Sequence, residues 1–332
     1  ITNNVVELTL QDEQEFKTPT IVWSSTTNGE IDQVQGDIPV SWSAGSYGST
    51  PINALQIGSS CTSIGSYAFT YCQFLTQDLV IPDSVTSIGS YAFYYCYDSD
   101  TGAGLTGSLT IPDSVTNIGS AAFYYVYGMT GALTIGNSVT TIGDYAFAYN
   151  SFSGDLVIPN SVTSIGVDAF ADNSNAFTGS LTLSQNPNFT TIPSRAFIDT
   201  PFTGTLNIPD NITTIEFQAF GYTNFSTIII PDSVTTIGDL GNQANGLSFS
   251  NNTSLTKVYI ACPVSSWSDN TGISKHFTNC TNLADIYVRA DHITGYDAAW
   301  RTGTGVPAGA TISTWTNYPN ICLLYTSPSP RD

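Results

Sequence analysis

The stretch SLTIPDSVTNIGSAAF, residues 108–123, is nearly a copy of DLVIPDSVTSIGSYAF, residues 78–93, and further copies follow along the chain. Alignment of the copies on their first apolar strand residue gives spacings of 22 to 30 residues between Leu55, Leu79, Leu109, Leu133, Leu156, Leu181, Leu206 and Ile228. Self-similarity at this period is the signature of a solenoid, in which no unit buries its apolar face alone and each stacks on its neighbours. The repeat predicts a fold, and by itself it predicts no function.

Each position of the consensus apolar-[ST]-G-x-L-x-I-P-D-S-V-T-x-I-G-x-x-A-F has a physical interpretation. Leu109 and Ile111 alternate with polar residues, which places them on the inner face of a short strand. Pro112 ends that strand because it has no N–H to donate, and Asp113 favours a turn. We expect Gly119 to permit a backbone bend, and the Ala-Phe pair to lie in a short turn or helical segment.

Composition excludes several classes of function. The chain has 332 residues, 41% of them apolar and only 10% charged, with a formal net charge of −19. No basic residue occurs between Lys17 and Arg195, whereas the same span carries twelve carboxylates. Clustered Lys and Arg hold phosphate backbones and anionic lipids, so nucleic acid and anionic membranes are disfavoured as partners. Apolar runs are too short for a transmembrane segment.

The two ends of the chain depart from the repeat. Residues 1–45 contain short β-type runs such as VVELTL, which predict an N-terminal β cap or the remainder of a preceding domain. Residues 46–240 hold the regular repeats, and residues 241–321 hold degenerate C-terminal repeats and a cap. The last stretch, CLLYTSPSPRD at 322–332, resembles the in-frame translation of a sequencing adaptor and is expected to be non-native. We expect the chain to be a fragment without its own targeting signal.

The repeated IPDSVTxIGxxAF string resembles the BspA-like leucine-rich repeats over roughly residues 50–290. FSNNTSLTKVYI at 249–260 and FTNCTNLADIYV at 277–288 resemble the family's last coils, and DHITGYDAAW at 291–300 resembles its closing segment. The resemblance implies a mainly β repeat solenoid, a leucine-rich-repeat-type right-handed stack of about ten coils with a β N-terminal cap.

The same resemblance implies a function. Such proteins are secreted or displayed at the cell surface, where they bind protein or glycan ligands in adhesion, without catalysis and without a cofactor. A structural spacer or surface-layer component without a specific ligand is the main alternative, and an ice-binding solenoid is a further one. The shared motif is structural, so no ligand-binding residue transfers from the family to this chain.

Histidine usage agrees with a non-catalytic chain. His276 and His292 are the two histidines, and neither accompanies a recognisable Ser or Cys nucleophile motif. A hydrolytic triad requires a base placed beside a nucleophile, and nothing in the sequence indicates one. No Cys-x-x-Cys or His cluster has zinc spacing, so no metal site is predicted.

Four cysteines suggest two alternative roles. Cys72 and Cys96 occupy the same position of adjacent coils, and Cys280 occupies it in a later one. Equivalent Cα atoms of stacked coils lie about 5 Å apart, within disulfide reach. Possible disulfides therefore join Cys72 to Cys96 and Cys262 to Cys280. The alternative is a small buried thiol that lines a core ladder.

Two polar columns also have alternative readings. The residues after proline, Asp83, Asp113, Asp210 and Asp232, could form an acidic column that binds calcium, but solvated turn residues explain them better. A threonine recurs in every coil at Thr62, Thr86, Thr116, Thr140, Thr163, Thr190, Thr213 and Thr235. We interpret it as a ladder of hydroxyls that bond neighbouring turns, since the adjacent exposed positions are too irregular for an ice lattice.

Tyrosine is the most suggestive feature for binding. One column follows the Ala-Phe pair and a second precedes it, and together they comprise Tyr67, Tyr71, Tyr91, Tyr95, Tyr125, Tyr145 and Tyr149. If the segment turns helically, residues four apart share one side. Tyrosine offers a large contact area at low entropy cost, so these rings are the candidate ligand-binding residues. The alternative is that they only cover the convex side of the coils.

Overall fold

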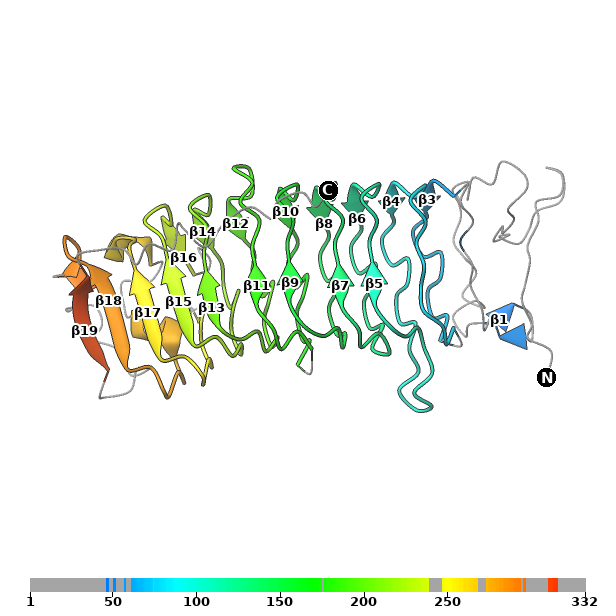
Figure 1. Cartoon of the computed structure of the whole chain (residues 1–332). Coiled ribbons are helices and arrows are strands. Elements are labelled where there is room, and N and C mark those ends of the chain that lie inside the picture. Colours follow the sequence, from blue (N-terminus) through cyan, green and yellow to red (C-terminus); the bar gives the residue numbers. More distant parts are fainter. Residues whose placement is uncertain are drawn as a thin grey trace, which may run out of the picture.

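The structure is a computed structural model of the chain, and it describes residues 46–47, 50–51, 57, 61–73, 75–174, 176–238, 247–267, 273–293, 295–296 and 310–315. Within them the coils stack into an elongated parallel β-solenoid (Figure 1). The predicted N-terminal cap at 1–45 and the tail at 322–332 lie outside the described residues.

One side of the solenoid is a column of two-residue strands, each of which ends in a buried isoleucine. Five of them pair in parallel and in register, so that Ile64, Ile88, Ile118, Ile142 and Ile165 lie side by side. A second parallel sheet of three strands continues the column. The strands are β3 (Ser63–Ile64), β4 (Ser87–Ile88), β6 (Asn117–Ile118), β8 (Thr141–Ile142), β10 (Ser164–Ile165), β12 (Thr191–Ile192), β14 (Thr214–Ile215) and β16 (Thr236–Ile237).

A second side is formed by strands that contain the repeat leucine or its equivalent, as the alternation of apolar and polar residues predicted, and these strands also pair in parallel. The strands are β5 (Leu109–Thr110), β7 (Leu133–Thr134), β9 (Leu156–Val157), β11 (Leu181–Thr182), β13 (Thr205–Asn207), β15 (Thr227–Ile230), β17 (Lys257–Ile260), β18 (Asp285–Arg289) and β19 (Thr311–Trp315). The sequence analysis did not identify β19, which pairs in parallel with β18 and extends the stack by one more strand.

A few elements lie outside these columns. An antiparallel pair, β1 (Ser46–Tyr47) and β2 (Thr50–Pro51), precedes the first coil. Two short 3₁₀ helices, η2 (Val264–Ser266) and η3 (Ile273–Phe277), lie between β17 and β18.

Phenylalanine rings form the spine of the core. The Phe of each Ala-Phe pair, or its equivalent in the last two coils, stacks on the corresponding ring of the next coil, with ring centroids 5.0–5.8 Å apart. These rings are Phe69, Phe93, Phe123, Phe147, Phe170, Phe197, Phe220, Phe249 and Phe277, and all are buried. Because each ring is covered by the rings of its neighbours, burial depends on stacking, as expected for a solenoid.

The threonine ladder is structural, as predicted. The hydroxyl of one threonine donates to the backbone carbonyl of its equivalent in the preceding coil, for example Thr86 Oγ1 to Thr62 O at 2.9 Å and Thr140 Oγ1 to Thr116 O at 2.9 Å. The pair Thr235 and Thr213 repeats the contact at 3.2 Å. These hydroxyl hydrogens are used within the protein, which weakens the ice-binding alternative.

The glycine of the Ile-Gly pair has a different role from the one expected. Gly119 is not among the glycines with positive φ, so the residue is not needed for a bend of the backbone. A Cβ at Gly119 would lie 2.4 Å from the backbone nitrogen of Ser90 in the preceding coil, and one at Gly143 would lie 2.4 Å from that of Ser120. Glycine is therefore required because consecutive coils approach each other too closely for a side chain.

The Ala-Phe segment is a turn and not a helix. Its alternate N–H groups donate to the next coil, for example Tyr91 N to Ser120 O, Phe93 N to Ala122 O and Tyr95 N to Tyr124 O, each at 2.8 Å. The backbone at Tyr91 and Tyr95 is left-handed, with φ of 59° and 56°. The helical alternative is therefore wrong, although residues four apart in this segment do share the outer side of the coil.

Candidate binding face

The tyrosines of successive turns form one continuous surface, here called the tyrosine face. It contains all seven predicted residues, Tyr67, Tyr71, Tyr91, Tyr95, Tyr125, Tyr145 and Tyr149, together with four that the prediction omitted, Tyr94, Tyr97, Tyr124 and Tyr127. The Tyr-Tyr pairs at 94–95 and 124–125 are visible in the sequence and could have indicated part of the missing column.

Rings of neighbouring coils on this face stack on one another. Tyr67 and Tyr91 lie with centroids 4.9 Å apart and planes 3° from parallel. Tyr94 and Tyr124 stack at 5.1 Å. These distances match the spacing between stacked strands, so the coil repeat itself sets the ring spacing. Such pairs contribute about 0.5–1.5 kcal/mol each beyond their area burial.

The rings are partly exposed at the outer surface. Tyr67 is 49% exposed and Tyr145 is 39% exposed, and the other tyrosines of the face are half-buried. Some rings stack and others meet edge to face, as Tyr71 and Tyr94 do with planes at 90°, so ring faces are in contact with neighbouring rings. The face therefore offers hydrogen-bonding groups and apolar edges together.

Tyrosine occupies an unfavourable backbone conformation on this face. The two columns have φ between 56° and 62°, a region that Asn and Asp tolerate better than bulky residues. Later coils have Asp172, Asp199, Asn251 and Asn279 at one of these left-handed positions. Other coils have Ala121, Asp168, Arg195 and Gln218 at the second left-handed position, so the repeat imposes this backbone conformation whichever residue stands there.

Burial and mutual proximity raise the pKa of several phenols on the face. Desolvation raises the pKa of Tyr149 to about 12, and a hydrogen bond to Asp172 and the charge of that residue add to the shift. Desolvation also raises the pKa of Tyr94 and Tyr124, with further contributions from neighbouring tyrosines. Tyr94, Tyr124 and Tyr149 therefore hold their phenol protons more tightly than free tyrosine does.

The C-terminal end of the tyrosine face is acidic. Asp168, whose side chain is 1% exposed, pairs with Arg195 at 2.9 Å. Tyr145 and Tyr149 hydrogen-bond to Asp168 and Asp172. Desolvation raises the pKa of Asp168, while the charge of Arg195 lowers it. Aromatic and acidic residues therefore share one surface at this end.

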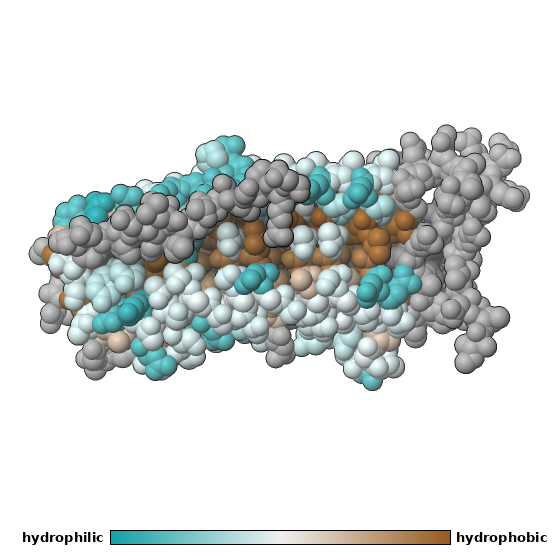
Figure 2. All heavy atoms as spheres, viewed as in Figure 1, coloured by the Kyte–Doolittle hydropathy of each residue, from teal (hydrophilic) through white to brown (hydrophobic). Residues whose placement is uncertain are grey.

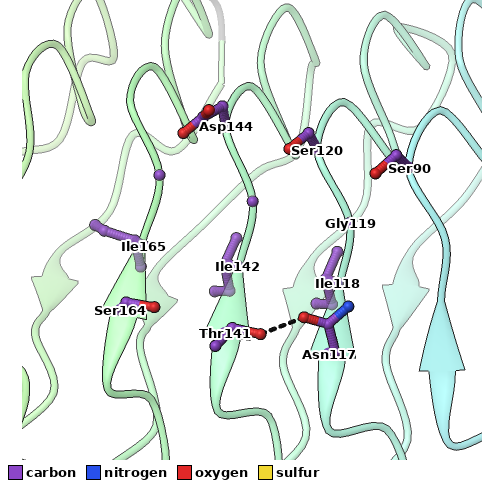
Figure 3. A pocket seen from close by; sticks show the side chains of 12 residues that line it. Ser90, Asn117, Ile118, Gly119, Ser120, Thr141, Ile142, Asp144, Ser164 and Ile165 are labelled. Carbon is purple, nitrogen blue, oxygen red and sulfur yellow. Dashed lines mark hydrogen bonds between the residues drawn. The ribbon is translucent and has the colours of Figure 1, made fainter.

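A shallow groove of about 420 Å³ borders the tyrosine face over strands β6, β8 and β10 (Figure 3). Ile118, Ile142 and Ile165 line it, and Ser120 and Asp144 line its edge. An apolar band runs lengthwise between polar margins on the side of the molecule shown in Figure 2. Asp144 directly precedes Tyr145 of the tyrosine face, so the groove and the face are neighbours in the chain.

Neither possible disulfide is present in the structure. Cys72, Cys96, Cys262 and Cys280 are free, buried thiols. Burial raises the pKa of Cys72 and of Cys280 to about 12, and that of Cys262 to about 11. The alternative role, a small buried thiol in a core ladder, is the one that the structure contains.

Cys72, Cys96 and Cys280 belong to a buried polar column that follows the left-handed residue of each coil by one position. Each donor in this column bonds to the carbonyl of the spine phenylalanine in the preceding coil, with distances of 2.7–3.3 Å. The donors are Cys96, Asn150, Asn173, Thr200, Asn252 and Cys280. Cys, Asn and Thr are therefore interchangeable solutions to one hydrogen-bonding requirement.

The remaining candidates are the acidic column and the histidines. Asp83, Asp113, Asp210 and Asp232 are exposed, and no group of three or more metal-ligating His, Cys, Asp or Glu side chains occurs in the described part of the chain. His276 Nδ1 lies 3.4 Å from Ser248 Oγ, but both side chains are fully buried. This contact is consistent with core packing.

Parallel coils joined by isoleucine, leucine and phenylalanine ladders define a leucine-rich-repeat solenoid. The family model described as "BspA type Leucine rich repeat region" matches residues 42–176 and 190–300, in six copies. The chain therefore belongs to the BspA-type leucine-rich repeat family, as its sequence indicated.

Solved structures of bacterial leucine-rich repeat proteins are similar to this chain. A leucine-rich repeat protein from Bacteroides ovatus is 23% identical, with a TM-score of 0.47, over 76% of this chain and 66% of that one. A leucine-rich cell surface protein from Faecalibacterium prausnitzii is 21% identical, with a TM-score of 0.36, over 78% of this chain and 84% of that one. No curated protein matches the chain.

No helix among the described residues has the length and apolar character needed to cross a membrane.

Proposed function

We propose that this protein is a non-catalytic binding module, secreted or displayed at the cell surface, that recognises a protein or glycan ligand in adhesion. The family is one of repeat scaffolds, which supply long surfaces for contact. No cofactor and no nucleic acid enter this proposal, and the chain's charge of −19 disfavours nucleic acid.

One observation carries the proposal: tyrosine is retained at strained, left-handed positions in consecutive coils. Tyr71, Tyr95, Tyr125 and Tyr149 all have φ near 60°, where the later coils have mainly Asp or Asn. A spacer without a ligand would need only small polar residues there. Tyrosine is enriched among residues that dominate binding energy at protein interfaces.

Binding of the full chain to arrays of extracellular-matrix proteins and of glycans tests the proposal. The variant Tyr95→Ala/Tyr125→Ala is assayed beside the wild type, and circular dichroism establishes that both are folded. We expect selective binding that the variant loses. Absence of binding by a folded wild-type sample, or equal binding by both proteins, would favour the structural-spacer alternative.

A further inference from the structure

We infer that the tyrosine face and the carboxylates at its C-terminal end act as one surface, and that its partner is a basic protein segment. This inference rests on the proposed function and selects a protein over a glycan as the ligand. It has two independent parts, the orientation of the rings and the distribution of charge.

The orientation of the rings disfavours a glycan. A sugar packs its C–H groups on the open face of an aromatic ring. On the tyrosine face, Tyr95 and Tyr125 cover each other at 4.5 Å, and Tyr67 and Tyr91 at 4.9 Å. Tyr71 and Tyr94 meet edge to face, so their ring faces too are in contact with neighbouring rings. The hydroxyls and edges that remain suit contact with side chains and backbone groups of a protein.

The distribution of charge selects a basic partner. The column of Tyr149 continues with Asp172 and Asp199, because Tyr149 N donates to Ala171 O and Asp172 N donates to Ile198 O in consecutive coils. Asp168 is neutralised by Arg195, but within the described residues no cation pairs with Asp172 or Asp199. Desolvation, followed by the charge of Asp172, raises the pKa of Asp199. A cation from a partner would relieve this repulsion.

The size of the surface fits a protein partner. The combined surface extends over six coils, from Tyr67 to Asp199, and five coil-to-coil steps at the strand spacing give a length of roughly 25 Å. An interface that buries about 800 Å² on each partner is a patch about 28 Å on a side, which is close to this length. The chain has no basic residue between Lys17 and Arg195, and Arg195 itself is paired with Asp168.

Binding to purified probe proteins tests the inference. The full chain is immobilised and exposed to the basic proteins lysozyme and cytochrome c, to the acidic protein ovalbumin, and to a glycan array. Three double variants are compared: Asp172→Asn/Asp199→Asn, Tyr95→Asn/Tyr125→Asn, and the control Asp83→Asn/Asp210→Asn. The control removes the same charge at exposed sites outside the surface.

We expect the basic probes to bind and the acidic probe and glycans not to bind. Loss of Asp172 and Asp199 should weaken binding about tenfold and reduce its salt dependence, and the control should change it less than about twofold. An equal loss in the control would reveal non-specific attraction to net charge and overturn the inference. Binding to glycans would leave the proposed function intact and refute the basic partner. The same would follow if the tyrosine variant lost binding and the Asp172→Asn/Asp199→Asn variant did not. If neither the tyrosine variant nor the aspartate variant lost binding, both the proposed function and this inference would be refuted.

Discussion

The rings of Tyr95 and Tyr125 lie face to face, with centroids 4.5 Å apart, although each residue has a left-handed backbone with φ of 56° and 58°. Stacking stabilises this pair, while the backbone conformation opposes it. Asparagine tolerates the same backbone and occupies the equivalent position at Asn251 and Asn279.

We therefore expect the free energy of unfolding of Tyr95→Asn/Tyr125→Asn to lie within about 1 kcal/mol of the wild-type value, because relief of backbone strain offsets the lost stacking. The Ala pair should be less stable than the Asn pair, because alanine relieves less strain. Urea unfolding followed by circular dichroism measures both. A loss of several kcal/mol in the Asn pair would assign these rings to the core.

Substitution of Gly119 should destabilise the middle of the stack. A Cβ there would lie 2.4 Å from Ser90 N, so the two coils must separate. We expect Gly119→Ala to lower the free energy of unfolding by about 1–3 kcal/mol or more, as overpacking does. Gly65 is the matched control, because a Cβ there would meet no atom of the described residues within 4 Å. Gly65→Ala should be neutral or slightly stabilising, and equal losses in both variants would contradict the close-approach argument.

Much of the fold was predictable because the same pattern of apolar residues recurs in every coil. The alternation at Leu109 and Ile111 predicted inward strand residues, and both are buried. Strand β19 was missed because ATISTW, at 310–315, lacks the repeat's proline and glycine. The role of Gly119 was also missed, since the distance between coils is not visible within one coil.

The candidate face was only partly predictable. Two columns of tyrosine were visible at fixed positions of the repeat, but the column of Tyr94 and Tyr124 is interrupted by Thr70 and Ala148 in the flanking coils. The left-handed backbone could not be predicted, because tyrosine is not typical of that conformation. The alignment of Tyr149 with Asp172 could not be predicted either, because it depends on which residues of neighbouring coils pair, and only the structure gives that register.

Asn150 should be essential to the buried polar column. Its Oδ1 accepts from Val126 N at 2.8 Å, and its Nδ2 donates to Phe123 O at 2.9 Å. Asn150→Val leaves both backbone groups without this partner, so we expect a loss of about 2–4 kcal/mol in urea unfolding. Asn150→Thr keeps a donor, as Thr200 does, and should lose less. Equal losses in the Val and Thr variants would show that side-chain volume alone matters.

Alkaline pH should destabilise the protein through the tyrosine face. The pKa of Tyr149 rises from 10.0 to about 12 in the folded state, so the folded protein holds this proton more tightly than the unfolded chain. Its stabilising contribution is complete below pH 10 and disappears as the pH rises toward 12. Urea unfolding at pH 8, 10 and 11 should give decreasing stability, with a smaller decrease in Tyr149→Phe. An identical pH dependence in that variant would refute the role of Tyr149.

The buried thiols should not react with a thiol reagent in the native protein, and all of them should react in the unfolded protein. Burial raises the pKa of Cys72 to about 12, so almost no thiolate exists at pH 8, and the residue is only 2% exposed. In a Cys322→Ser variant, which removes the cysteine of the tail, Ellman's reagent should modify no thiol before denaturation. In guanidinium chloride it should modify five, namely Cys61, Cys72, Cys96, Cys262 and Cys280. Recovery of three or one would reveal one or two disulfides and restore the alternative pairing, because each disulfide removes two titratable thiols. Rapid modification of the native protein would instead show that the coils open around this column.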